Sequence, residues 1–142
     1  MMAMTVAPTM LIELKRRARD AATRAYAPYS RFPVGAAVLA ADGAIHAAAN
    51  VENASFGLSI CAERAAIFQA IAHGAHRIEA VVIYTPTTEA TAPCGACRQV
   101  LHEFGPEALI VACTDDERAE RSFTLPALLP DPFGSGSVPG PR

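Results

Sequence analysis

Two short segments decide how this chain folds: CAER at residues 61–64 and PCGACRQ at residues 93–99. Together they contain three thiols and one carboxylate. Each segment stands where a helix is expected to begin, and Pro93 is tolerated there because the N–H that it lacks would have no partner in the first turn. We therefore interpret the rest of the chain as a frame that brings two helix starts together around a metal ion, with a general acid/base beside it.

The composition indicates one domain. The chain has 142 residues, of which 51% are hydrophobic, and this is enough to bury a core without disulfide bonds. We expect a single domain over residues 1–142. The ends, 1–8 and 134–142, are expected to be flexible, since the second is rich in Gly, Ser and Pro.

Charge and hydropathy favour a small substrate. The net charge of -2 creates no field that would hold a polyanion, and no Lys/Arg run lies beside aromatic residues. No apolar run approaches the roughly 20 residues of a bilayer span, and residues 1–14 lack the pattern of an export signal. We therefore expect no nucleic-acid polymer and no membrane as a partner, and a cytoplasmic location. Closely spaced thiols that stay reduced there favour metal binding over disulfides.

Apolar periodicity predicts the element order α-β-β-α-β-α-β-β. The first helix is expected to be capped by Thr9 and to continue until Pro28. A hairpin is expected at 34–50, with its turn at Asp42-Gly43. The later elements are a helix at 61–73, a strand at 78–84, a helix that follows Pro93 and ends before Gly105, and strands at 108–113 and 121–125. This order implies a mixed sheet with helices packed on it, in which each strand-helix-strand crossover gives parallel neighbours.

Three of the four cysteines are placed as zinc ligands. Cys94 and Cys97 are three positions apart at a helix start, so their sulfurs share one side, and the helix dipole there favours thiolates. Cys61 begins the other helix. A catalytic Zn²⁺ has three protein ligands and keeps a fourth position for water, so we expect one Zn²⁺ per subunit.

Glu63 and Arg64 follow the first ligand directly. Glu63 lies about 200° around an ideal helix from Cys61, so its carboxylate should diverge from the thiolate and stay free for proton transfer. Three thiolates give the zinc site a net negative charge, which would make its water less acidic than at a three-histidine site. The two helix N-termini and Arg64, donating to the sulfurs, are expected to offset that charge.

These segments resemble the small, homotetrameric, zinc-dependent cytidine deaminases. A C-x-x-C preceded by proline, with an upstream Cys-x-Glu, is the signature of zinc-dependent base deaminases. The similarity runs from about Tyr26 to Phe133. The further shared segments are YAPYSRFPVGAA at 26–37, NVENA at 50–54 and LLP at 128–130. The resemblance implies a single cytidine deaminase domain with a three-layer α-β-α fold, an α/β fold whose mixed five-stranded sheet carries helices on both faces.

The resemblance implies a role for each matching position of the metal site. Cys61, Cys94 and Cys97 would hold the zinc ion, and Glu63 would be the catalytic residue that moves protons. Arg64 would hydrogen-bond the metal-bound sulfurs from outside the ligand set.

The resemblance also implies five substrate-binding positions. Asn50 and Glu52 would bind ribose hydroxyls, and Phe32 would pack against the pyrimidine. The backbone amide of Ala62 would donate to O2 of the base. Phe133 would come from a neighbouring subunit to close the pocket, so that the homotetramer shares its active sites.

The implied reaction is hydrolytic deamination of cytidine and 2′-deoxycytidine, with release of ammonia, as a step of pyrimidine salvage. Glu63 would take a proton from water and pass it to N3 of cytosine, and would later deliver a proton to the leaving amine. Two residues depart from the family pattern: Phe56 stands where tyrosine is common, and Ala65 where threonine is usual. Local hydrogen bonding and subunit contacts are expected to differ there.

Other interpretations stay open from the residues alone. A C-x-x-C pair is often a redox pair or part of a structural zinc site, whose fourth ligand here would be Cys113 or His102. A zinc-stabilised interaction module would need no Glu63. A deaminase of another aminopyrimidine nucleoside, such as a nucleoside antibiotic, would share the zinc motif. A polynucleotide-editing deaminase would need basic and aromatic residues that this chain largely lacks.

Overall fold

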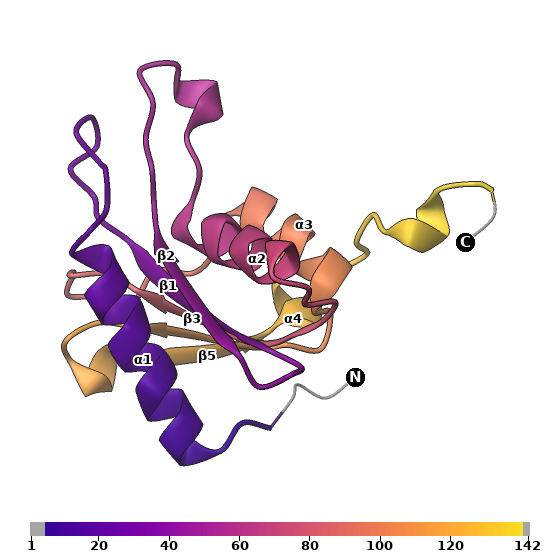
Figure 1. The fold of residues 1–142 in the computed structure, drawn as a ribbon, viewed down its shortest axis with the longest axis horizontal. Helices are drawn as coiled ribbons and strands as arrows, with labels where there is room; N and C mark the ends of the chain where they lie inside the picture. Colours follow the sequence, from indigo (N-terminus) through magenta and orange to yellow (C-terminus); the bar gives the residue numbers. More distant parts are fainter. Residues whose placement is uncertain (1–4, 141–142) are drawn as a thin grey trace.

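A five-stranded sheet in the order β2-β1-β3-β4-β5 forms the middle of the molecule (Figure 1). The computed structural model describes residues 5–140. The strands are β1 (Gly35–Ala40), β2 (Ile45–Ala49), β3 (Ile78–Tyr84), β4 (Leu109–Cys113) and β5 (Arg121–Thr124). Among these described strands, β3 and β4 are the one parallel pair of neighbours, and the other pairs are antiparallel. The sheet is therefore mixed, as predicted.

Helices cover both faces of the sheet (Figure 1). One face carries α1 (Pro8–Ala22), and the other carries α2 (Ala62–Ala72) and α3 (Gly95–Phe104), with the short α4 (Leu125–Leu128) near α3. Successive residues of a strand point to opposite faces. Accordingly Val82 packs in the apolar cluster under α1, whereas its neighbour Val81 packs in the cluster under α2 and α3. The predicted three-layer α-β-α fold is confirmed.

The strand order corrects one expectation. The crossover through α3 joins parallel neighbours, β3 and β4, as expected. The crossover through α2 does not, because β1 lies between β2 and β3 and pairs with both of them in antiparallel fashion. The hairpin partner β1 therefore lies inside the sheet, between β2 and β3; its six residues are all buried and contribute to both cores.

The first helix differs from its prediction at both ends. It begins at Pro8, and Thr9 lies inside the helix and not at its cap, because proline is well suited to the first helical position. It ends at Ala22, well before Pro28. The chain leaves the helix early to reach the sheet, where the Tyr26 amide donates to the Asn50 carbonyl at 3.0 Å.

The other elements lie within a few residues of their predicted places. Gly74 ends the α2 segment with a φ of +95°, a conformation that favours glycine. Four short elements were not predicted from the sequence: α4 and the 3-10 turns Phe56–Leu58, Glu117–Ala119 and Ser135–Ser137. The expected flexible ends, 1–8 and 134–142, lie partly outside the described residues; within them, Pro8 already begins α1. Within residues 5–140, no helix has the length and apolar character needed to cross a bilayer.

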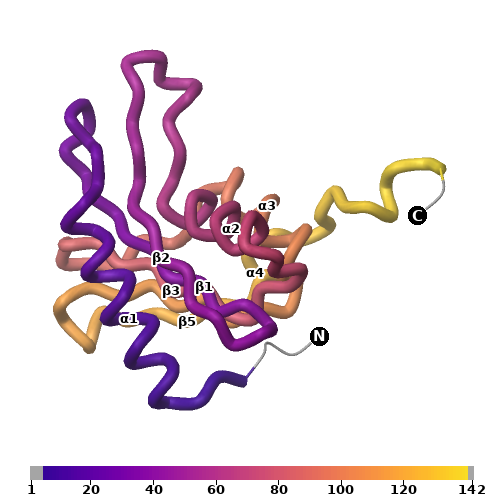
Figure 2. Tube along the Cα trace, viewed as in Figure 1, coloured from indigo at the N-terminus to yellow at the C-terminus, as the bar shows by residue number. Residues whose placement is uncertain are grey.

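Two loops rise from one end of the sheet (Figure 2). One is the turn at residues 27–33, which follows α1, and the other is an arm at residues 50–60, which leads from β2 to α2. Isolated bridges join Tyr26 to Val51 and Val51 to Ile60. The two loops are therefore tied together at their bases, directly before the start of α2.

We predict that Gly35→Ala destabilises the protein. A Cβ atom at Gly35 would lie 1.9 Å from the Ala18 carbonyl oxygen and 2.7 Å from the Ala22 nitrogen, both of which are helix backbone atoms. Overpacking of this kind is expected to lower the free energy of unfolding by about 2–3 kcal/mol in urea titrations. Gly57→Ala is the control, because no atom beyond its chain neighbours lies within 4 Å of the place that the added methyl group would take. Equal midpoints for the two variants would show that α1 does not pack this closely on β1.

Candidate active site

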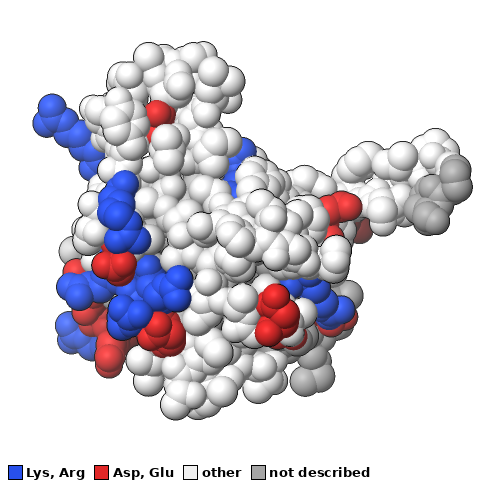
Figure 3. Space-filling model, in the orientation of Figure 1, with Lys and Arg blue, Asp and Glu red and all other residues white. Residues whose placement is uncertain are grey.

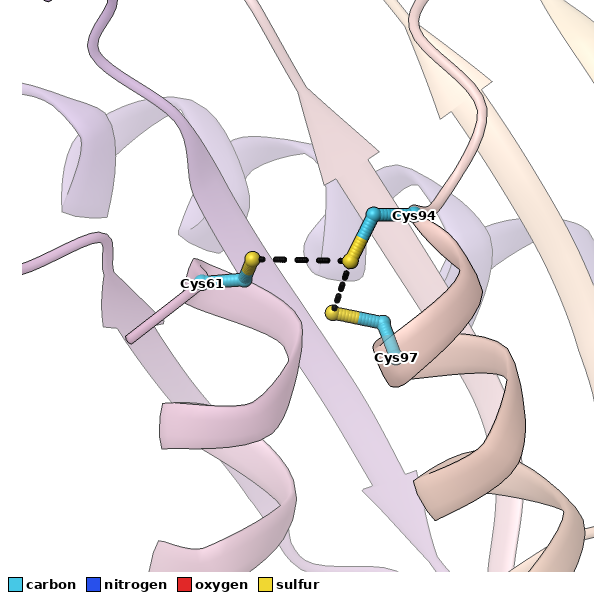
Figure 4. Close-up of side chains that lie close together, drawn as sticks. All are labelled: Cys61, Cys94 and Cys97. Atoms are coloured by element: carbon cyan, nitrogen blue, oxygen red, sulfur yellow. Dashed lines mark hydrogen bonds between the residues drawn. The ribbon is translucent and has the colours of Figure 1, made fainter. Parts of the chain in front are cut away.

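Three cysteine sulfurs converge between the starts of α2 and α3 (Figure 4). Cys61 directly precedes α2, Cys94 directly precedes α3, and Cys97 lies in the first turn of α3. The Sγ atoms of Cys61 and Cys94 are 3.7 Å apart, and those of Cys94 and Cys97 are 3.4 Å apart. All three lie within 4.8 Å of one another, and each cysteine is free of a disulfide. The structure thus brings together all three predicted ligands.

This sulfur cluster fits a zinc ion. Tetrahedral coordination with Zn–S bonds of about 2.3 Å puts two sulfurs about 3.8 Å apart, close to the separations observed. Among the described residues, no fourth His, Cys, Asp or Glu joins the cluster. The donor set therefore leaves a fourth position for water, as in a catalytic site and unlike a closed structural one.

Neither alternative fourth ligand belongs to the cluster. Cys113 is only 5% exposed and packs with Leu14 and Ala18 under α1, on the far side of the sheet from α2 and α3. Burial raises the pKa of the Cys113 thiol to about 11, which suits a neutral core residue. His102 lies in the last turn of α3, near Gly134 of the C-terminal segment.

Arg64 supplies positive charge to the sulfurs. Its Nη2 atom donates to Cys61 Sγ at 3.3 Å, and its Nε atom is buried without a hydrogen-bond partner. Hydrogen bonds from Cys97 and then Arg64 lower the pKa of Cys61 to about 5 against the effect of burial. The hydrogen bond to Cys61, in turn, raises the pKa of Arg64. Cys61 is therefore a thiolate at neutral pH, which is the form that binds metal.

Cys97 has the opposite shift. Its hydrogen bond to Cys61, followed by burial, raises the pKa of the Cys97 thiol. Without a metal ion, the Cys97 thiol therefore keeps its proton to a higher pH than an ordinary cysteine does. Binding of Zn²⁺ at this cluster would displace that proton, since zinc takes cysteine as thiolate.

Glu63 lies in the first turn of α2 and stays outside the sulfur cluster. It is only 6% exposed. Burial is the main reason that the pKa of Glu63 is raised, and the negative charge of Cys61 adds to the effect. A carboxyl group with a raised pKa can both accept and donate a proton near neutral pH.

Four of the predicted substrate-binding residues precede or follow Cys61 in the chain, and they differ in how far they are exposed to solvent. Ala62 is fully buried at the first position of α2, where backbone amides have no partner within the helix. Asn50 is 8% exposed, and Glu52 is half-buried on the arm. Phe32 is exposed on the 27–33 turn.

A cavity of about 340 Å³ adjoins Glu52. It is lined by Tyr29, Ser30, Glu52, Phe56 and Ser59. Larger cavities of about 550 and 450 Å³ lie beside α1, and their linings include none of the predicted site residues. Of these three cavities, the one of about 340 Å³ is therefore the one whose lining includes a predicted substrate-binding residue, Glu52.

Phe133 is not brought to this site. It belongs to the C-terminal segment that extends away from the body of the chain (Figure 1), and its side chain is 63% exposed. The Gln99 amide group donates to the Phe133 carbonyl at 2.7 Å, so α3 holds the root of this segment.

Arg98 supports the site in a way that was not predicted from the sequence. Its Nε donates to the Pro93 carbonyl at 2.7 Å, and its Nη1 donates to the Leu128 carbonyl at 2.9 Å. Arg98 thus ties the residue before Cys94 to the end of α4. Its place beside Cys97 in the motif was a signal, but its partners are backbone atoms that no motif names.

The two departures from the family pattern have different surroundings. Phe56 lacks the hydroxyl of a tyrosine, and its ring meets that of Tyr29 edge-on, with centroids 5.8 Å apart and planes at 64°. The Ala65 amide donates to the Cys61 carbonyl at 3.0 Å in ordinary helical fashion. The ring of Phe56 therefore joins the arm to the 27–33 turn, a contact that a tyrosine ring could also make.

Comparison with known proteins identifies the family. Residues 9–113 match the family described as the cytidine and deoxycytidylate deaminase zinc-binding region. The chain belongs to the cytidine deaminase family. A cytidine deaminase of Halalkalibacterium halodurans is 43% identical over 87% of this chain and 92% of that protein. One of Mycobacterium tuberculosis is 41% identical over 91% and 93%.

A solved structure agrees with this assignment. The crystal structure of cytidine deaminase from Burkholderia pseudomallei superposes with a TM-score of 0.81 at 43% identity, covering 90% of this chain and all of that one. In this cytidine deaminase family member, the zinc-binding region of the family and the three-sulfur geometry indicate the same cofactor, one Zn²⁺ per subunit.

We predict that zinc content separates Cys97 from Cys113. Cys97→Ala removes one of three sulfurs and should lower bound zinc to a small fraction of one equivalent, as measured by elemental analysis after dialysis. Cys113→Ala removes a similarly buried thiol from the opposite face and should retain one equivalent. Loss of zinc from Cys113→Ala with an intact fold would contradict the three-sulfur site.

Proposed function

We propose that this chain catalyses the hydrolytic deamination of cytidine and 2′-deoxycytidine to uridine and 2′-deoxyuridine, with release of ammonia, as a step of pyrimidine salvage. The observation that carries the proposal is the open three-sulfur cluster with a buried carboxyl group beside it. Relatives of similar length, about 40% identical, are named cytidine deaminases. The reduced thiols that the site needs favour a cytoplasmic location.

Cys61, Cys94 and Cys97 would hold the zinc ion. Bound Zn²⁺ would supply a water of lowered pKa as the nucleophile that attacks C4 of the base. Arg64 donates to Cys61 Sγ and has no carboxylate partner among the described ion pairs, so its full charge offsets the thiolates. Without such an offset, three thiolates would make the nucleophile harder to deprotonate.

Glu63 would carry the protons. It takes one proton from water and gives it to N3 of cytosine as the water oxygen bonds to C4. It then takes the second proton of that water from the hydroxyl on C4 and delivers it to the exocyclic amine, so that the C4–N bond breaks, the C4 carbonyl forms and ammonia leaves. One group serves as base and then as acid, which requires a pKa near the working pH. Burial in the first turn of α2 supports this role, since it is the main cause of the raised pKa of Glu63.

The substrate would lie between the arm and the 27–33 turn. Phe32 would pack against the pyrimidine, and the Ala62 amide would donate to O2. Asn50 and Glu52 would face the ribose. Of these four residues, Glu52 lines the cavity of about 340 Å³ between the turn and the arm, a volume at the lower end of the range for small-molecule sites.

The surface charge does not favour a polynucleotide substrate. Basic and acidic side chains lie intermixed over α1 on the face shown in Figure 3. Several of them pair directly: Arg16 with Glu13, Arg19 with Asp115 and Arg24 with Asp20. A groove for a nucleic-acid strand would instead need uncompensated positive charge along its length.

We also propose a homotetramer in which Phe133 closes the active site of a neighbouring subunit. The exposure of Phe133 on an extended segment supports this arrangement. So do the exposed apolar side chains of Val51, Phe56 and Leu58 on the arm, which would be buried by a partner subunit.

We predict that Glu63→Gln keeps the fold and the zinc ion but loses activity. The amide cannot move protons, so kcat for cytidine should fall by about 10³-fold in an assay of the ultraviolet change from cytidine to uridine. Glu103→Gln, which changes an exposed carboxylate on α3, is the control and should retain activity. Near-normal turnover of Glu63→Gln would remove Glu63 from the proposed scheme.

We predict that two defective chains restore each other. Phe133→Ala and Glu63→Gln should each be poorly active alone. In a co-expressed mixture, random assembly should give about a quarter of the sites an intact Glu63 together with an intact Phe133 from a neighbour. Light scattering should give the mass of four chains. A monomeric mass, or a mixture no more active than its components, would contradict shared active sites.

A further inference from the structure

The 27–33 turn is held by a side chain of the arm. Both the Tyr29 and the Ser30 amides donate to the same oxygen of Glu52, Oε1, at 2.9 and 3.1 Å. Glu52 also lines the cavity, together with Tyr29 and Ser30. One carboxylate therefore holds the backbone of the turn and borders the space between the turn and the arm.

Asn50 holds the same segment two residues further along. Its Nδ2 donates to the Phe32 carbonyl at 2.9 Å, and its Oδ1 accepts from the Val34 amide at 2.9 Å. At 8% exposure, this amide group is largely shielded from competition by water. Backbone bonds from Asn50 to the Val34 carbonyl, and from Glu52 to the Tyr26 carbonyl, set the register between arm and turn.

Phe32 depends on these contacts because its own turn is strained. The preceding residue, Arg31, has a φ of 55°, in the left-handed region that side-chain-bearing residues rarely adopt. Such a conformation persists only where surrounding contacts over-determine it. Here they include the Phe32 amide donating to Ser30 Oγ at 3.0 Å. Without Glu52, the turn would keep fewer of the bonds that oppose relaxation at Arg31.

We propose that Glu52, assisted by Asn50, is a positioning residue that fixes the ring of Phe32 by holding the backbone of its turn, whether or not the substrate has ribose hydroxyls. The inference rests on the proposed function, since it gives Phe32 the base as its contact. It goes beyond ribose binding, because the bonds that carry it are made in the protein without substrate.

The charge of Glu52 suits this role. Hydrogen bonds from the hydroxyl and then the amide of Ser30, together with that of Tyr29, lower the pKa of this carboxyl group. A carboxylate that accepts backbone N–H groups makes stronger bonds than a neutral acceptor. A ribose hydroxyl and the turn would then share one rigid group, so sugar binding and the placement of the base would be coupled.

The test compares Glu52→Ala with Glu52→Gln on two substrates. The glutamine carbonyl can accept from Tyr29 and Ser30, whereas alanine cannot. The second substrate is 2′,3′-dideoxycytidine, which lacks the 2′ and 3′ hydroxyls of the ribose. With it, Glu52→Ala should raise KM by about tenfold relative to wild type. Glu52→Gln should stay within about threefold. With cytidine, both variants should lose more, because the ribose contact is weakened as well.

A substrate-free measurement accompanies the kinetics. Amide hydrogen exchange at Tyr29 and Ser30 should be about tenfold faster in Glu52→Ala, with exchange in α1 and α3 unchanged. Glu107→Ala is the matched control, since it also removes a carboxylate, one that pairs with Arg77 at the surface and not with the turn. It should alter neither exchange at the turn nor KM.

The outcomes distinguish the inference from the function. If Glu52→Ala lowers activity on cytidine but matches wild type on dideoxycytidine, Glu52 acts through ribose alone, and the inference fails while the deaminase function stands. Unchanged amide exchange at Tyr29 and Ser30 would also overturn it. If the wild-type protein deaminates neither nucleoside, the proposed function fails, and the substrate part of the inference fails with it.

Discussion

The convergence of three sulfurs is the constraint on which the rest of the structure depends. Cys61 and Cys94 are 33 residues apart in the chain, yet their Sγ atoms lie 3.7 Å apart. This requires α2 and α3 to begin at the same place on one face of the sheet. The arm after β2 leads to the start of α2, and the loop after β3 leads to the start of α3. The sheet order, with β1 between β2 and β3, sets the spacing of the two helices that those loops reach.

The site makes two opposite electrostatic demands within a few residues. It stabilises negative charge on sulfur, so the pKa of Cys61 falls to about 5, and it disfavours negative charge on Glu63, whose pKa is raised. These opposite pKa shifts arise because the two side chains have different surroundings. Cys61 receives hydrogen bonds from Cys97 and Arg64, whereas Glu63 lies two positions along in a buried helical turn with little access to water. One helix start would therefore hold both a metal ligand, Cys61, and a proton carrier, Glu63, two positions apart.

Local chemistry made much of this predictable. The turn at Asp42-Gly43, the stop at Gly74 and the spacing of Cys94 and Cys97 each constrain the backbone through neighbouring residues, and the elements that they predict are present. What could not be predicted depends on distant partners. The early end of α1 reflects the Tyr26–Asn50 bond, the place of β1 reflects pairing on both its edges, and the role of Arg98 reflects two carbonyls on separate segments.

The two halves of the proposed site are held in place by different means. On the metal side, regular helices position the cysteines and Glu63, so their geometry follows from the packing of α2 and α3 on the sheet. On the substrate side, an irregular turn with a strained Arg31 carries Phe32, and side chains of the arm hold it. Because an irregular turn has no ladder of backbone bonds, its few side-chain bonds carry proportionally more of its stability. Substrate preference should therefore respond to changes at Asn50 and Glu52 that leave the zinc ion in place.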